Sequence, residues 1–197
     1  MPSEPVFSRR AAHAFTPEGS PRTYTLAALT YLERQALRAD LTRTAGANPS
    51  RELMLAAVRS AIKELRASNE GELLAIVKAA EEEPDNPDAQ TRLAALEAVI
   101  ATVPVYADLR AAREAFAGAM PYVAARHALR GWHGPQLPEF RRTRGVVPDD
   151  LLDVLPIDEL TAIGWAAWDM MTVTPSAEKN SAPPSPSLET PETSPEA

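Results

Sequence analysis

Residues 48–65 read NPSRELMLAAVRSAIKEL, and this stretch decides the fold class. Its apolar side chains recur at intervals of three and four residues, which is the spacing of one face of an α-helix: Leu53, Met54, Ala57, Val58, Ala61, Ile62 and Leu65. Asn48 supplies a helix cap, and Pro49 suits the first helical turn. The stretch therefore predicts an amphipathic helix of about five turns.

The same kind of signal extends in both directions along the chain. Thr30 is followed three residues later by Glu33, a pair that can exchange side-chain and backbone hydrogen bonds at a helix start. Capping residues and apolar spacing predict further helices at 31–45, 70–83, from Pro87, from Pro104, 148–155 and 156–171. Pro121 is expected to kink or divide the helix that begins at Pro104.

Strands are expected only near the N-terminus. Residues 23–26 alternate polar and apolar side chains, and a run from about Val6 to Phe15 can pair with them through a turn at Gly19. Residues 131–147 read as a loop. The predicted fold class is therefore mostly α, a multi-helix bundle with a small N-terminal β-hairpin.

The last 26 residues have a different composition, TVTPSAEKNSAPPSPSLETPETSPEA. They contain six of the 19 prolines, and Leu188 is the one large apolar side chain after Val173. Such a segment cannot bury enough surface to offset its backbone entropy, so it is predicted to be a disordered tail. The expected organisation is a hairpin region at 1–27, a helical body at 28–171 and a tail at 172–197.

Composition excludes several classes of protein. The chain has 197 residues, a net charge of −7 and no cysteine, which excludes a disulfide framework, a cysteine-ligated metal and a thiol nucleophile. Its acidity argues against a general nucleic-acid coat. The start lacks the apolar core of a secretory signal, and no apolar run approaches the length of a membrane span. A cytoplasmic protein without a membrane partner is expected.

The known catalytic motifs are absent from the sequence, and neither an enzyme activity nor a cofactor is expected. One set of residues suits a metal or acid–base site by chemistry, because imidazole and carboxylate bind zinc or iron: His127, His133, Asp149, Asp150 and Asp153. The alternative is a hydrogen-bonded His127 on an apolar helix face, with the aspartates at a helix N-terminus. We favour this alternative, because nothing fixes the spacing of the ligands.

Arginines concentrate within nineteen residues, interleaved with Trp132 and Phe140: Arg126, Arg130, Arg141, Arg142 and Arg144. Guanidinium groups beside aromatic rings suit phosphates and single-stranded nucleic acid. The acidic body instead favours a solvated or intramolecularly paired loop, or an acidic protein partner.

The final predicted helix carries Trp165, Trp168, Met170 and Met171. On a helical wheel, Trp168 and Met171 fall with the apolar residues, whereas Trp165 falls to one side. A core role is favoured, and a partner groove remains open because tryptophan and methionine anchor adaptable interfaces.

Two stretches carry a resemblance to a known family. TYTLAALTYLERQALRADL at 23–41 and, less closely, residues 156–187 with AEKNSAPPSPS resemble the tail assembly chaperones of long-tailed bacteriophages. The order of parts is also similar, with a short strand pair, a helical body and a Pro-rich tail. A different phage tail or head-completion protein is the neighbouring alternative.

The resemblance implies a non-enzymatic function in the host cytoplasm. Such chaperones bind the tape-measure protein, keep it soluble and help to recruit tail-tube subunits. Client contact is then expected at six side chains: Leu26, Tyr31, Leu32, Trp165, Trp168 and Met170. The competing hypothesis is a nucleic-acid-binding or head-completion accessory that uses the basic loop at 126–144.

Overall fold

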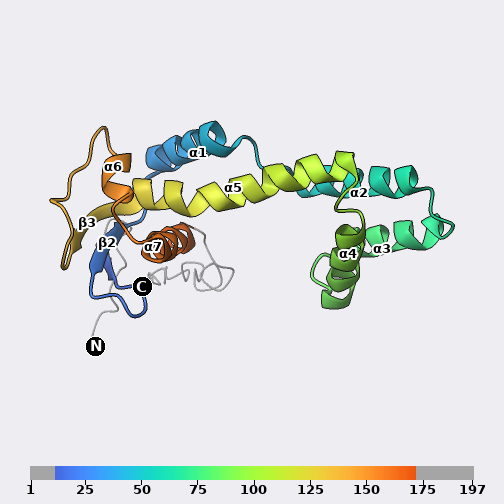
Figure 1. The fold of residues 1–197 in the computed structure, drawn as a ribbon, viewed down its shortest axis with the longest axis horizontal. Helices are drawn as coiled ribbons and strands as arrows, with labels where there is room; N and C mark the ends of the chain where they lie inside the picture. The colour runs from blue at the N-terminus through green and yellow to red at the C-terminus, as the bar shows by residue number, and fades with distance from the viewer. Residues whose placement is uncertain (1–11, 172–197) are drawn as a thin grey trace, which may run out of the picture.

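The computed structural model describes residues 12–171, and most of these residues are helical (Figure 1). The order of elements is β1 (Ala12–Phe15), β2 (Thr23–Ala27), α1 (Tyr31–Ala45), α2 (Arg51–Leu65), α3 (Glu70–Glu82), α4 (Pro87–Val99), α5 (Pro104–Ala128), β3 (Leu129–His133), α6 (Asp149–Leu152) and α7 (Ile157–Asp169). The predicted mostly α fold with an N-terminal hairpin is confirmed. The predicted disordered tail, and the part of the first strand before residue 12, lie outside the described residues.

Helix α5 is the long axis of the molecule, and the other elements pack against its two ends (Figure 1). We call α2, α3, α4 and the first half of α5 the distal lobe; its buried core includes Ile62, Val77 and Ile100. We call the sheet, α1, α6, α7 and the second half of α5 the sheet lobe. The helical body therefore forms two packed groups that share one helix.

The sheet has three antiparallel strands in the order β1-β2-β3. Tyr24 in the central strand pairs with Phe15 on one side and Trp132 on the other. The prediction that residues 131–147 form a loop is therefore wrong at its start, where β3 extends through residue 133. The reason is tertiary, because LRGWH has no alternation of its own and acquires strand structure by pairing with the open edge of β2. This pairing joins the hairpin region to the helical body.

Side chains cap the starts of α1 and α2, at the predicted residue in α1 and at a different residue in α2. At α1, the Thr30 amide donates to Glu33 Oε2 at 2.9 Å and the Glu33 amide donates to Thr30 Oγ1 at 3.3 Å, so the predicted capping pair is confirmed. At α2, the cap is Ser50, whose Oγ accepts from the Leu53 amide at 3.2 Å. The prediction of a cap at Asn48 is wrong because the serine hydroxyl, two residues later, satisfies the first free amides.

Pro121 lies inside α5, which continues unbroken to Ala128. The proline therefore does not divide the helix. Helix α7 packs against this turn, where Gly164 meets the backbone of Pro121 so closely that an added Cβ would overlap the proline carbonyl. Helix α7 therefore lies directly against the turn of α5 that contains the proline.

Within residues 12–171, none of the helices combines the length and the apolar character that a bilayer crossing requires.

Candidate functional site

A small groove separates α1 from α7 where both helices pack on α5. Its volume is about 130 Å³, and it is lined by Arg34, Leu37, Arg38, Trp168 and Met171. We call this feature the α1–α7 groove. Both helices are anchored beneath it, because Leu37 of α1 and Ala167 of α7 are buried in one core cluster. The position of the groove is therefore fixed by the core of the sheet lobe.

The groove combines an apolar interior with a basic rim. Leu37 is buried, and Trp168 and Met171 are half-buried at the core edge. Arg34 Nε donates to the Leu29 carbonyl at 3.2 Å, whereas Arg38 is exposed and forms no hydrogen bond or ion pair with any described residue. Half-buried aromatic and thioether groups beside guanidinium suit an apolar side chain with a carboxylate nearby.

Two exposed aromatic side chains extend this surface. Tyr31 lies one turn before Arg34 on α1 and is 71% exposed; Trp165 lies one turn before Trp168 on α7 and is 43% exposed. Residues three and four positions apart share one side of a helix. Of the predicted contact residues, Trp168 thus lines the groove, and helix spacing places Tyr31 and Trp165 one turn from lining residues.

The other three predicted contact residues lie elsewhere. Leu26 is 1% exposed and belongs to the sheet core, so its side chain offers no surface to a partner. Met170 packs on that same core, and the next residue, Met171, lines the groove instead. Leu32 is 77% exposed, yet it lies roughly 100° around α1 from Tyr31 and points away from the groove.

Sequence reasoning missed Arg34, Leu37, Arg38 and Met171 as groove residues. Arg34, Leu37 and Arg38 stand at positions i, i+3 and i+4, and this spacing already indicates that they share one side of a helix. Their connection with Trp168 was not visible, because it depends on how α1 and α7 pack across α5.

Most arginines of the basic loop at 126–144 form hydrogen bonds or ion pairs within the chain. Arg130 Nη2 donates to Glu33 at 2.9 Å, and Arg142 Nη2 donates to the His127 carbonyl at 3.2 Å. Arg126 pairs with Asp40 and Asp149, and Arg141 pairs with Asp150. Among these five arginines, only Arg144 has no hydrogen bond or ion pair within residues 12–171. The intramolecularly paired alternative is therefore confirmed for the other four.

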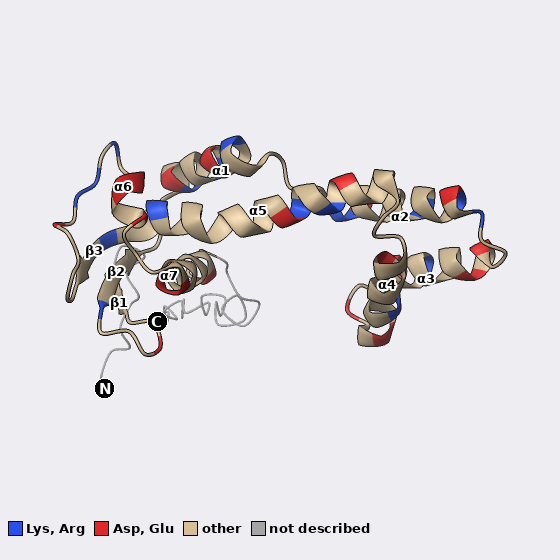
Figure 2. Ribbon diagram, viewed as in Figure 1, with Lys and Arg blue, Asp and Glu red and all other residues tan. Residues whose placement is uncertain are grey.

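Charges elsewhere are also mixed in sign. Figure 2 shows basic residues divided among α1, the β3–α6 loop and the α2–α5 region, with acidic residues between them. The loop itself is closed by packing, since Trp132 meets Phe140 edge to face at 4.9 Å and donates from Nε1 to the Pro138 carbonyl at 2.8 Å. The mixed charges and the internal pairing of the loop therefore favour an intramolecular role for these arginines over nucleic-acid binding.

The structure separates the residues of the metal or acid–base hypothesis. His127 is 5% exposed, and its Nε2 lies 3.1 Å from Asp40 Oδ2. Burial lowers the pKa of His127, while the hydrogen bond and charge of Asp40 act in the opposite direction. His133 is exposed at the end of β3. In the part of the chain that the structure describes, no three His, Asp or Glu side chains are grouped to hold a metal ion.

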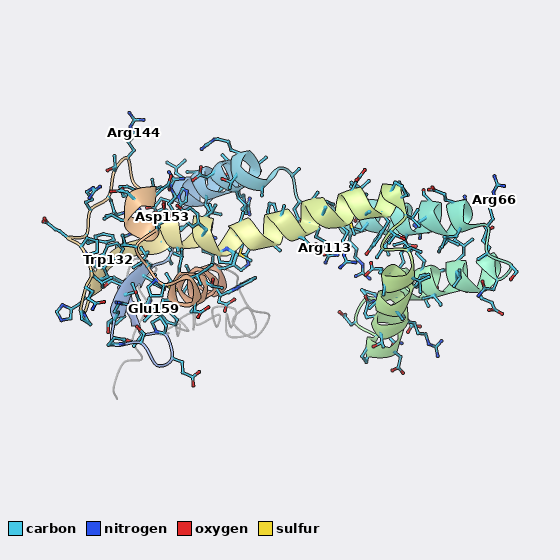
Figure 3. The ribbon with its side chains drawn as sticks, in the orientation of Figure 1. Arg66, Arg113, Trp132, Arg144, Asp153 and Glu159 are labelled. Atoms are coloured by element: carbon cyan, nitrogen blue, oxygen red, sulfur yellow. The ribbon has the colours of Figure 1, made fainter. Side chains whose placement is uncertain are left out.

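A partly buried ion pair between Arg22 and Glu159 holds α7 against the sheet. Glu159, labelled in Figure 3 near the start of α7, accepts from Arg22 Nη1 at 2.9 Å and from the Tyr24 hydroxyl. Burial raises the pKa of Tyr24, and the bond to Glu159 raises it further. Because Trp168 lies in the last turn of α7 and Met171 lies just beyond it, these contacts help to position the groove.

Two of the hollows in the distal lobe are larger than the α1–α7 groove but more polar. Two cavities of about 510 and 400 Å³ between α2, α4 and α5 share Met54, Ala94, Glu97 and Arg113. Arg113 points toward α4 in Figure 3. Met54 is only 4% exposed, and the shared lining also carries the charged side chains of Glu97 and Arg113. The α1–α7 groove is the stronger candidate because aromatic, thioether and guanidinium groups meet there.

Comparison of the chain with protein-family models, with curated proteins and with solved structures gives no match.

Proposed function

We propose that this chain is a non-enzymatic tail assembly chaperone of a long-tailed bacteriophage, acting in the host cytoplasm. In this role it binds a helical segment of the tape-measure protein and helps to recruit tail-tube subunits. The observation that carries the proposal is the α1–α7 groove, where Trp168 and Met171 remain accessible beside Arg34 and Arg38. The resemblance of residues 23–41 and 156–187 to this class supplies the identity of the client.

The groove favours a particular kind of client segment. An apolar side chain of the client enters between Leu37 and Trp168, and Tyr31 and Trp165 cover the flanking turns of the client helix. Burying apolar area stabilises the complex by about 25 cal/mol per Å² before the costs of association are subtracted. Arg38 on the rim adds preference for acidic neighbours. The expected client is therefore an amphipathic helix with an acidic flank.

The experiment is co-expression with the adjacent tape-measure product, followed by capture of the complex. The double variant Tyr31→Ser plus Trp165→Ser should release the client, because both side chains are exposed and contribute little to the core. The matched control is Leu53→Ser plus Val99→Ser, which removes comparably exposed apolar side chains from the distal lobe. A client that is equally soluble and unbound with or without this chain would overturn the proposal.

A further inference from the structure

The α1–α7 groove has room for one side chain. Its volume of about 130 Å³ is close to that of cavities left by removing a single large apolar side chain. The interior is apolar, and the rim carries Arg34 together with Arg38, which has no partner among residues 12–171. A matching occupant has one aliphatic side chain directly beside a carboxylate.

The chain's own sequence beyond Met171 contains such a pair. Leu188 is the one large apolar residue after Val173, and Glu189 follows it directly. Glu192 and Glu196 add negative charge nearby, and Lys179 is the one basic residue of this segment. The segment is thus complementary to the groove in both apolar content and charge.

The covalent connection favours an intramolecular contact. Met171 lines the groove, so the segment begins at the edge of the groove itself. A Pro- and Ser-containing chain of about 17 residues spans on the order of 20–30 Å, and such a link gives an effective concentration in the millimolar range. Even a contact with an intrinsic dissociation constant near 1 mM would then be substantially populated.

We infer that Leu188 docks in the α1–α7 groove with Glu189 against Arg34 and Arg38, and that this contact occupies the client site until a client displaces it. The displacement step rests on the proposed function, whereas the docking itself does not. Client binding would then release residues 172–197 for a second partner. The groove would act as a switch that exposes this segment only on client-loaded chains.

The absence of cysteine from the sequence allows a direct test on the full chain. A nitroxide attached to Ser187→Cys is the only label in the molecule, and its effect is read as broadening of methyl signals in NMR spectra. Docking predicts strong broadening of Leu37 and Met171, which line the groove, and none of Met54 in the distal lobe. The matched control carries the same label with Leu188→Ser, and there the broadening of Leu37 should be lost.

Three results would overturn the docking proposal. The first is equal broadening of Leu37 with and without Leu188→Ser. The second is unchanged broadening in the variant Arg34→Gln plus Arg38→Gln, because the rim charges then play no part. The third is broadening that appears only when spin-labelled chains are mixed with isotope-labelled, spin-free chains, because the contact is then between two copies.

The client experiment separates this inference from the proposed function. If both hold, Leu188→Ser should bind the client several-fold more tightly, since the competing segment is removed. If no client binds while broadening of Leu37 persists, the proposed function fails and docking stands. If the client binds equally to both chains and Leu37 is not broadened, docking fails and the proposed function stands.

Discussion

Nε2 of His127 lies 3.1 Å from Oδ2 of Asp40, and this contact joins α5 to α1 inside the sheet lobe. The same carboxylate accepts from Arg126 at 3.2 Å and from Arg43 at 2.6 Å. Asp40 is therefore the common acceptor for three basic side chains. Since α1 carries one wall of the α1–α7 groove, this network also supports the candidate site.

Replacing Asp40 should destabilise the protein strongly. Asp40→Ala leaves Arg126 and His127 without their shared acceptor, and breaking such a buried pair costs about 2 to 4 kcal/mol after allowance for the partial exposure of Arg126. Chemical denaturation measures the loss. Asp85→Ala, at an exposed position with no hydrogen bond within residues 12–171, is the control and should change stability little. Equal stability of the two variants would contradict this role of Asp40.

Stability should fall as the pH drops through the range in which free histidine titrates. The pKa of His127 is lowered chiefly by burial; Asp40 opposes this effect, and Arg126 and Arg142 add to it. Because the unfolded chain binds this proton more readily, the contribution is complete above about pH 6.5 and declines below it, by at most about 1.4 kcal/mol per pH unit.

Denaturation at a series of pH values from 7.5 to about 5 tests this, since carboxyl titration lies mostly below that window. His127→Gln should flatten the pH dependence, and His133→Gln, at an exposed position, should leave it unchanged. The same slope in both variants would show that His127 is not the responsible group.

Protonation of Glu159 should cause a separate loss of stability at lower pH. Burial raises the pKa of this carboxyl, but hydrogen bonds from Tyr24 and Ser20 and the charge of Arg22 outweigh that effect and lower it. A lowered carboxyl pKa means stability that is present above about pH 4.5 and lost below it.

Glu159→Gln removes the charge that Arg22 pairs with and should cost about 1.5 to 3 kcal/mol at neutral pH. Asp158→Asn is the matched control, because Asp158 lies in the same first turn of α7 but is exposed and lacks the ion pair. Thermal unfolding at pH 7 compares them. Client binding in the groove should weaken with Glu159→Gln, since α7 loses its anchor on the sheet.

The features that the sequence predicted well are those encoded within a few residues. The Thr30–Glu33 capping pair and the prolines that begin α4 and α5 specify helix starts without reference to the rest of the chain. Strand β3 could not be found this way, because its hydrogen bonds come from β2, about a hundred residues earlier. Local sequence patterns therefore predicted the helices but not the third strand of the sheet.

The candidate site was half predictable for a related reason. The apolar content of α7 marked Trp165 and Trp168, and the helical wheel grouped Met171 with Trp168, but client contact was assigned to Met170. Packing on α5 places Met171 in the groove and Met170 on the sheet core. The arginines of residues 126–144 suggested a candidate polyanion surface. Their acidic partners Glu33 and Asp40 could not be identified from the sequence, because both lie on α1, far away in the chain.

Two glycine-to-alanine changes should have opposite effects. At Gly164, an added Cβ would overlap the Pro121 carbonyl, so Gly164→Ala must push α7 away from α5 and should cost about 1 to 3 kcal/mol or more. At Gly118, within α5, nothing lies within 4 Å of an added Cβ, so Gly118→Ala should stabilise the helix by up to about 1 kcal/mol.

Urea unfolding of both variants measures these changes with one protocol. Gly164→Ala should also reduce client capture, because the overlap moves the α7 wall of the groove that carries Trp168 and Met171. Gly118→Ala should leave capture unchanged, since Gly118 lies outside the groove lining. If Gly164→Ala were as stable as the parent chain, α7 would not pack on Pro121 as closely as the structure places it, and the width of the groove would have to be reconsidered.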